Sequence, residues 1–152
     1  MQSADVSMEI QKVKGLPEIL RTMYRCAEVF PNPSLKDDKL INTLAQKYAE
    51  IAEFYVMYSG TETAGFIAYY CHDESRNAYV SMLMVREKFQ RQGIGRAFLD
   101  RVIEDCNKLG KDRIRLEVDL DNEKGLAFYK KNGFAREGSA SDKTDYYALE
   151  LL

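Results

Sequence analysis

Apolar and polar residues follow two different periods along the chain, and the clearest change of period lies between residues 79 and 109. Tyr79 to Val85 is β-prone and apolar on both faces of a period-two pattern, which is typical of a central strand. From Ile94 to Leu109, apolar residues recur at helical spacing with charged residues between them, which predicts an amphipathic helix. This part of the chain is therefore predicted to form a strand, a loop from Gln90 to Arg96, and a helix.

The same two periods divide the rest of the chain. Strands are predicted over 6–13, 53–58, 65–71, 113–119, 134–137 and 146–151, and helices over 16–30, 34–51 and 123–131. Pro31 and Pro33 end the first helix, and Ser34 with Asp37 resembles a capping box for the second. Residues 59–63 are the predicted five-residue turn of a hairpin. The strand and helix around the loop, together with strand 113–119, are predicted to form a βαβ unit.

The loop before the central helix contains two glycines, Gly93 and Gly95. Because glycine has no Cβ, the backbone there can approach a ligand closely. The first N–H groups of the helix point into the loop and carry the positive end of the helix dipole. Four basic residues and one acidic residue lie between positions 86 and 96. The segment is therefore predicted to bind a phosphate or a diphosphate, the alternative being a purely structural turn between strand and helix.

Two other kinds of phosphate-binding loop do not fit this segment. A Walker loop requires glycine and lysine followed by serine or threonine, and the segment has no such sequence. A dinucleotide-binding loop requires three glycines in the pattern G-x-G-x-x-G, and Phe98 stands where the third glycine would fall.

The loop and the segments after it resemble the acetyl-coenzyme A site of the GNAT superfamily of N-acetyltransferases. The loop has the form Gln-x-x-Gly-x-Gly at 90–95 and follows an apolar strand. The matching segments downstream are Leu116-Glu117-Val118, Asn122, Ala127-Phe128-Tyr129 and Asn132-Gly133-Phe134. The resemblance implies an α/β (α+β) architecture, the GNAT fold, with a mixed central sheet of six to seven strands, flanking helices and a central βαβ unit. The element order agrees over the whole chain, whereas the motifs lie between Leu83 and Phe134.

The resemblance also implies which residues hold acetyl-coenzyme A. In this family two parallel strands separate at their ends, and the pantetheine arm pairs with the freed backbone. The expected binding residues are Leu83, Met84 and Val85 on the strand and Arg91, Gln92, Gly93, Ile94, Gly95 and Arg96 around the diphosphate. Asn122 is expected to bind the pantetheine end, although an asparagine at that position also fits a helix cap.

Two side chains are candidates for proton transfer. Tyr129 stands where the family places its general acid, and a phenol with a pKa near ~10 is a feasible proton donor to a departing thiolate, whose thiol has a pKa near ~8.5. Glu117 matches the glutamate that acts as base in bacterial enzymes that acetylate ribosomal-protein N-termini. Tyr129 also fits a core tyrosine, and Glu117 also fits a surface carboxylate paired with Arg113 or Arg115. A main-chain N–H near Met84 or Val85 is expected to stabilise the tetrahedral intermediate.

These expectations define an acetyl-coenzyme A-dependent N-acetyltransferase in which a primary amine attacks the thioester directly. The acceptor is either a small-molecule amine or a protein N-terminus, and the Leu-Glu-Val pattern leans toward the peptide. The alternative is a non-catalytic domain of the same fold that senses acyl-coenzyme A. A homodimer is compatible with the family.

Composition narrows the remaining choices. A chain of 152 residues suits one domain, taken here as 1–152, and a net charge of −2 gives no global field for nucleic acid. No segment approaches the length of a membrane span, and the N-terminus lacks a signal-peptide pattern, so a cytoplasmic protein is expected. Three widely spaced cysteines suggest neither a disulfide framework nor a metal site. The single histidine, His72, is expected to be structural rather than a base.

Overall fold

The computed structural model describes residues 7–31 and 33–152. The strands are β1 (Met8–Lys12), β2 (Glu53–Ser59), β3 (Glu62–Tyr70), β4 (Asn77–Val85), β5 (Arg113–Asp119), β6 (Ala135–Ser139) and β7 (Thr144–Glu150). The α-helices are α1 (Leu16–Arg25), α2 (Asp38–Ile51), α3 (Ile94–Lys108) and α4 (Glu123–Lys131). Short 3₁₀ helices cover Ala27–Val29, Pro33–Lys36 and Glu87–Phe89. The predicted order of elements is confirmed; the predicted first strand began at Val6, which lies outside the described residues.

All seven strands form one mixed sheet in the order β1-β2-β3-β4-β5-β7-β6. Only β4 and β5 are parallel among the paired strands of the described residues, and α3 connects them. The other pairs are antiparallel, so the β4–α3–β5 segment is the predicted βαβ unit. The expected mixed sheet with flanking helices is confirmed.

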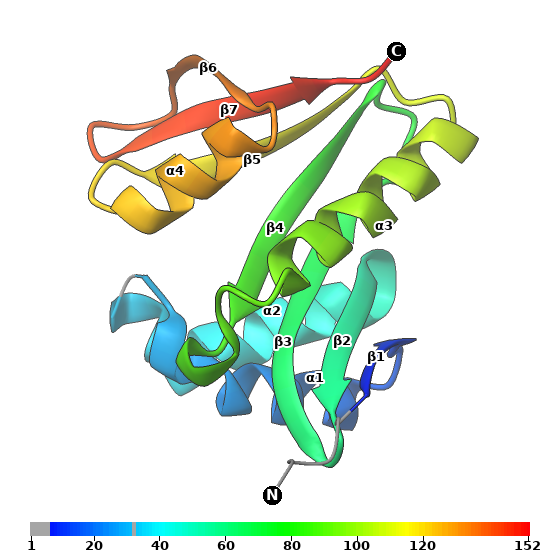
Figure 1. Cartoon of the computed structure of the whole chain (residues 1–152), viewed down its shortest axis with the longest axis vertical. Helices are drawn as coiled ribbons and strands as arrows, with labels where there is room; N and C mark the ends of the chain where they lie inside the picture. Colours follow the sequence, from blue (N-terminus) through cyan, green and yellow to red (C-terminus); the bar gives the residue numbers. More distant parts are fainter. Residues whose placement is uncertain (1–6, 32) are drawn as a thin grey trace, which may run out of the picture.

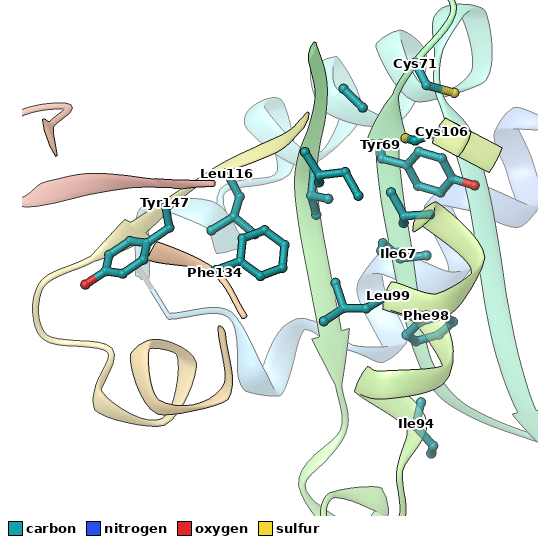
Figure 2. Packing of buried hydrophobic residues seen from close by; sticks show 14 of the residues in the cluster. Ile67, Tyr69, Cys71, Ile94, Phe98, Leu99, Cys106, Leu116, Phe134 and Tyr147 are labelled. Atoms are coloured by element: carbon teal, nitrogen blue, oxygen red, sulfur yellow. The ribbon is translucent and has the colours of Figure 1, made fainter. Parts of the chain in front are cut away.

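Each face of the sheet is covered by a different set of helices, as Figure 1 shows. The helices α1 and α2 pack on β2–β4 through residues such as Ile19, Ile41 and Phe54. The helix α3 packs on the opposite face, where Phe98 and Leu99 lie among the side chains of β3, β4 and β5. Figure 2 shows this second core, with Ile94, Phe98 and Leu99 on the side of Ile67 and Tyr69, and with Leu116, Phe134 and Tyr147 grouped further along the sheet.

Three local predictions differ from the structure. The first helix ends at Arg25 rather than at residue 30, and a 3₁₀ turn follows it. The cap of α2 is Asp37 itself, whose carboxylate accepts a hydrogen bond from the Lys39 N–H at 3.1 Å. The capping box was therefore wrong, because the carboxylate occupies the cap position and not the third helical position. The hairpin turn contains Gly60 and Thr61 instead of five residues, since Ser59 pairs with Glu62 and Gly60 takes a left-handed φ of 61°.

No helix within residues 7–31 and 33–152 is both long and apolar enough to cross a membrane.

Candidate active site

The strands β4 and β5 separate in the middle of the sheet. Their pairing begins at Asn77 with Arg113 and ends at Val80 with Leu116. Beyond that point β4 remains paired with β3 up to Val85, and β5 remains paired with β7 up to Asp119. The two strands therefore diverge as intact edges of two half-sheets, and Figure 1 shows the wedge between them. Backbone donors and acceptors that a parallel neighbour would use face this wedge.

The predicted binding residues of β4 lie along this wedge. Leu83, Met84 and Val85 belong to the part of β4 that has no partner on the β5 side. Their side chains are partly buried, with Leu83 and Val85 on the α3 face and Met84 on the α1–α2 face. The structure thus places the three residues where their main chain is accessible to an extended ligand.

The glycine loop turns sharply between β4 and α3. Arg91 has a left-handed φ of 65°, and Gly93, the residue that precedes the helix, has a φ of 82°. A non-glycine residue at positive φ is uncommon and indicates that the surrounding structure imposes the turn. The Gln90 side chain supports it by donating a hydrogen bond to the carbonyl oxygen of Val85 at 2.9 Å.

The N-terminus of α3 carries main-chain donors without a partner in the helix. The first N–H to join the helical ladder is that of Ala97, which donates to Gly93 O at 3.0 Å. The N–H groups of Ile94, Gly95 and Arg96 precede it, and no side chain of the described residues caps them. The first turn contains no acidic residue either, so the positive end of the helix dipole is not neutralised. This geometry suits a diphosphate.

Side chains around the loop hold it against α4. The ring of Phe128 lies so close to Gly95 that a Cβ there would approach it to 2.8 Å, so only glycine fits without rearrangement. Arg96 pairs with Asp100 at 2.9 Å and donates to Asn132 Oδ1 at 2.8 Å. The exposed side chains of Arg91 and Gln92 do not enter the core.

Asn122 is the N-cap of α4 in the structure. Its Oδ1 accepts a hydrogen bond from the Gly125 N–H at 3.0 Å. The helix-cap interpretation is therefore correct, while a contact between Asn122 and a ligand stays a prediction.

Tyr129 lies on α4, at the wide end of the wedge. Its ring contacts Phe134 edge to face, with centroids 5.5 Å apart. Burial raises the pKa of its phenol well above the ordinary value, so the hydroxyl is protonated at neutral pH. No hydrogen bond from another described side chain occupies the hydroxyl group. Tyr129 is thus both a packed aromatic residue and an available proton donor.

Glu117 lies on β5 where the strand has just left β4. Its side chain is exposed and, among the described residues, forms no ion pair. The arginines considered as its partners are used elsewhere: Arg115 pairs with Glu137 at 2.7 Å, and Arg113 pairs with Glu150 at 2.8 Å. The Glu117 carboxylate is therefore exposed, and the two arginines expected to pair with it pair with other residues.

Two tyrosines beside Glu117 were not predicted from the sequence. Tyr146 of β7 is the direct cross-strand partner of Glu117. Tyr79 of β4 pairs with Arg115, two positions before Glu117, and burial together with the Glu117 charge raises its pKa to about 12. The sequence contains ten tyrosines, and only the strand register distinguishes these two.

The acidic residues of the C-terminal strands are paired with arginines. Arg136 binds Asp145 through two hydrogen bonds of 2.8 and 3.2 Å, and Glu137 and Glu150 pair with arginines of β5. These contacts join β5, β6 and β7.

A hollow of about 750 Å³ lies at the other end of the sheet. Its lining includes Lys12, Lys47, Glu53, Tyr70, His72 and Tyr79. His72 is bonded to Glu53 at 2.6 Å, and Lys12 pairs with the same carboxylate at 2.7 Å. His72 is therefore a partner of Glu53 and lies away from the glycine loop.

The described residues contain no cluster of three histidine, cysteine or acidic side chains that could hold a metal ion. Cys26, Cys71 and Cys106 are buried free thiols, and burial raises the pKa of each. A raised thiol pKa disfavours the nucleophilic thiolate, so these cysteines are packing residues.

A comparison with known protein families shows which family this chain belongs to. The sequence model of the acetyltransferase (GNAT) family matches residues 16–134. The chain belongs to the GNAT acetyltransferase family. The glycine loop, the wedge and α4 all lie within the matched range.

Individual relatives are similar over part of the GNAT chain in sequence and over most of it in structure. The ribosomal protein bS18-alanine N-acetyltransferase of Escherichia coli strain K12 is 35% identical over 65 residues, 43% of this chain and 42% of that protein. The chain therefore matches less than half of the length of that curated relative. The crystal structure of the Escherichia coli ribosomal-protein-S18-alanine N-acetyltransferase superposes with a TM-score of 0.72 at 22% identity, covering 95% of this chain and 94% of that one.

Two archaeal structures share the same fold. Ard1 of Thermoplasma volcanium has a TM-score of 0.74 at 27% identity, covering 97% of this chain and 99% of that one. The PaiA N-acetyltransferase of Thermoplasma acidophilum, solved in complex with coenzyme A, has a TM-score of 0.69 at 19% identity, covering 95% and 99%.

Proposed function

We propose that this chain is a single-domain, acetyl-coenzyme A-dependent N-acetyltransferase. The observation that carries the proposal is the row of uncapped N–H groups at Ile94, Gly95 and Arg96, directly beside the wedge between β4 and β5. Such donors bind a diphosphate, and an open strand edge binds an extended amide-containing arm. Coenzyme A contains both groups, and when bound as its acetyl thioester it would supply the acyl group.

Each predicted residue then has a task that its environment supports. Leu83, Met84 and Val85 offer main-chain groups to the pantetheine arm, and Asn122 lies at the far side of the wedge. Arg91 to Arg96 surround the diphosphate through their main chain, with Gly93 forming the left-handed turn before the helix and Gly95 leaving room for the Phe128 ring. A main-chain N–H of Met84 or Val85 is the donor proposed for the oxyanion.

Glu117 and Tyr129 carry the proton transfers in this proposal. As the amine nitrogen bonds to the acetyl carbon, Glu117 accepts the proton that nitrogen loses. As the carbon–sulfur bond breaks, Tyr129 donates the proton of its Oη to sulfur. These roles are supported by the exposed Glu117 side chain, which has no ion-pair partner in the described part of the chain, and by the protonated phenol of Tyr129.

The acceptor in the proposal is a primary amine, with a protein N-terminus ahead of free small-molecule amines. The Leu116-Glu117-Val118, Asn122 and Tyr129 pattern supports this choice, as does the sequence similarity to an alanine N-acetyltransferase of a ribosomal protein. An α-amino group with a pKa near ~8 is partly neutral at pH 7, whereas neutralising a lysine amine near ~10.4 costs about 4.6 kcal/mol. A single exposed carboxylate is therefore better matched to an α-amino group.

The decisive experiment combines calorimetry with thiol release. Coenzyme A and acetyl-coenzyme A are titrated into the protein, and thiol release is then measured with peptides that have free or blocked N-termini, with lysine and with a polyamine. Heat of binding and thiol release that requires a free N-terminus are expected. Glu117→Gln should retain binding and lose most of the thiol release.

The other outcomes are informative as well. Binding without transfer to any acceptor would favour a sensor of acyl-coenzyme A. The absence of binding by well-folded protein would remove the enzyme assignment.

A further inference from the structure

A buried hydroxyl pair joins α2 to β4. The hydroxyl of Tyr48 and Oγ of Ser81 are 2.7 Å apart, and either atom can be the donor. Tyr48 is 1% exposed, and its ring packs against Phe54 and Tyr70 with centroids 5.9 and 6.2 Å away. The ring is therefore held by aromatic neighbours, and its hydroxyl is aimed at one residue of the sheet.

Ser81 occupies the irregular position of β4. The β3–β4 register passes from Tyr69 with Val80 to Ala68 with Met82, which leaves Ser81 as an extra residue in a β-bulge. The pairing between β4 and β5 ends at Val80, immediately before the same residue. The bulge and the opening of the wedge thus begin at one position.

The bulge changes which face each later residue of β4 meets. Val80 and Leu83 lie in the core on the α3 face, whereas Met82 and Met84 lie in the core on the α1–α2 face. Without the extra residue, strict alternation would place position 82 on the same face as position 80. The direction of the main-chain groups from 82 to 85 depends on the bulge for the same reason.

We propose that the Tyr48–Ser81 hydrogen bond is a positioning contact for acyl transfer. It holds the bulge in place from the α2 side, and so it orients the main-chain groups of residues 82–85 toward the thioester. Tyr48 and Ser81 are positioning residues here, since neither is assigned a contact with reacting atoms. The inference rests on the proposed function, and it extends the site to α2, outside the loop and α4.

The proposed diphosphate-binding loop does not depend on the Tyr48–Ser81 hydrogen bond. It lies at residues 91–96, beyond the end of β4, and is held against α4 by the Phe128 ring beside Gly95 and by the hydrogen bond from Arg96 to Asn132. Loss of the hydroxyl pair should therefore leave the diphosphate contacts in place and affect coenzyme binding only through the pantetheine contacts of residues 83–85, by less than it slows the chemical step. It should slow the chemical step, because small misplacements of a reacting group reduce rates strongly.

The test compares Tyr48→Phe, Ser81→Ala, the double variant and Ser81→Thr with the wild type. We expect kcat to fall about tenfold in each hydroxyl-deleted variant, with KM for acetyl-coenzyme A changed by less than about twofold. The double variant should be no slower than the slower single variant, because both substitutions break one contact. Ser81→Thr keeps a hydroxyl at Cβ and should retain most of the wild-type kcat.

Thr22→Val is the matched control. It removes another buried hydroxyl of the α1–α2 layer, one that donates to Glu18 O at 2.8 Å within α1. Its melting temperature should fall as in Tyr48→Phe, with kcat unchanged.

Two failures are distinguishable. A wild-type protein that binds no coenzyme would overturn the proposed function and this inference together. Normal wild-type turnover with an unchanged kcat in Tyr48→Phe, or additive losses in the double variant, would overturn the positioning role alone.

Discussion

Tyr129 is a packed aromatic side chain whose hydroxyl we propose as the proton donor. Its ring is fixed by the edge-to-face contact with Phe134, while burial raises the pKa of its hydroxyl and keeps the proton in place. In the sequence, the spacing from Asn122 suggested the catalytic role, and the amphipathic character of tyrosine suggested packing. The structure makes the two compatible, because the ring and the hydroxyl meet different neighbours.

Replacing Tyr129 with phenylalanine is expected to keep the ring contact and remove the proton donor. The affinity for acetyl-coenzyme A, measured by calorimetry, should stay within about twofold, and kcat should fall by about 100-fold or more. Tyr58→Phe is the control, since Tyr58 lies on β2 and packs on the α1–α2 side. Equal turnover in Tyr129→Phe and wild type would remove Tyr129 from the role of general acid.

The sequence pointed to candidate site residues but not to the residues that surround them in the fold. Glu117 and Tyr129 follow from short patterns in one stretch of chain, whereas Tyr79 reaches Glu117 only through the β4–β5 register. Arg115 was a reasonable partner for Glu117, but in the structure it pairs with Glu137 of β6, which lies beside β7. Side-chain pairs between strands that are distant in sequence depend on the order and register of the whole sheet. A single sequence does not specify them.

At the scale of elements, α3 has a left-handed glycine at each end. Gly93 precedes the helix with a φ of 82°, and Gly110 follows it with a φ of 71°. A Cβ at either position would meet no atom of residues 7–31 and 33–152 within 4 Å, so a substitution at either site strains the backbone without a clash among them. This symmetry provides a pair of matched variants.

Gly93→Val and Gly110→Val are expected to lower the melting temperature by similar amounts. Only Gly93→Val should weaken coenzyme A binding, by at least about tenfold, because a side chain there changes the turn that presents the N–H groups. Calorimetry and thermal denaturation of both variants provide the comparison. Equal affinity in the two folded variants would contradict the loop assignment.

The β6–β7 hairpin is predicted to weaken in acid. The hydrogen bonds from Arg136 lower the pKa of Asp145 below its ordinary value. The ionised carboxylate of Asp145 therefore stabilises the folded state. This contribution is present at neutral pH and is lost as the pH falls through about 4 toward the lower, folded-state pKa. Asp145→Asn should lower the melting temperature at pH 7 and reduce its change between pH 7 and pH 3.

Asp142, in the turn of the same hairpin, is the control for Asp145. Within the described residues it forms no ion pair, so Asp142→Asn should leave the pH dependence as it is in the wild type. An Asp145→Asn profile parallel to the wild-type profile would show that the ion pair does not contribute.

The order of elements followed from periodicity, since long amphipathic and apolar runs specify helices and strands directly. The irregular features within the elements, such as bulges, caps and turns, did not follow from periodicity. The bulge at Ser81 has no local signature in a run that reads as a continuous strand. The two-residue hairpin turn and the Asp37 cap were misplaced by a few residues for the same reason: several polar residues compete there, and packing of the flanking elements selects among them.

At the scale of the whole molecule, one sheet lies between two hydrophobic cores, one on each face. The same sheet opens into two halves where β4 and β5 separate. The N-terminal half of the sheet holds β1–β4, and the C-terminal half holds β5–β7 with α4 beside them. They meet through α3 and the short parallel pairing from Asn77 to Val80. A ligand lying in the wedge would bridge both halves.

Coenzyme A at about 100 times its dissociation constant is expected to stabilise the fold by about 2.7 kcal/mol, provided that only the folded state binds it. For a chain of this size the melting temperature should rise by roughly 5–10 °C. Thermal denaturation with increasing coenzyme A measures the shift. Gly93→Val should show a much smaller rise, and an equal rise in that variant would place the bound molecule elsewhere.

The divergence of β4 from β5 also has a cost for the protein when it holds no ligand. Most proteins cover or pair the edges of their sheets. In this protein two strand edges within the sheet, at 81–85 of β4 and 117–119 of β5, do not pair with each other. Amide protons directed into that gap exchange with solvent quickly, unlike those that the same residues share with β3 or β7. A coenzyme arm bound there would act as the missing strand, so the protein without a ligand is expected to be the form most open to mispairing with another chain during storage.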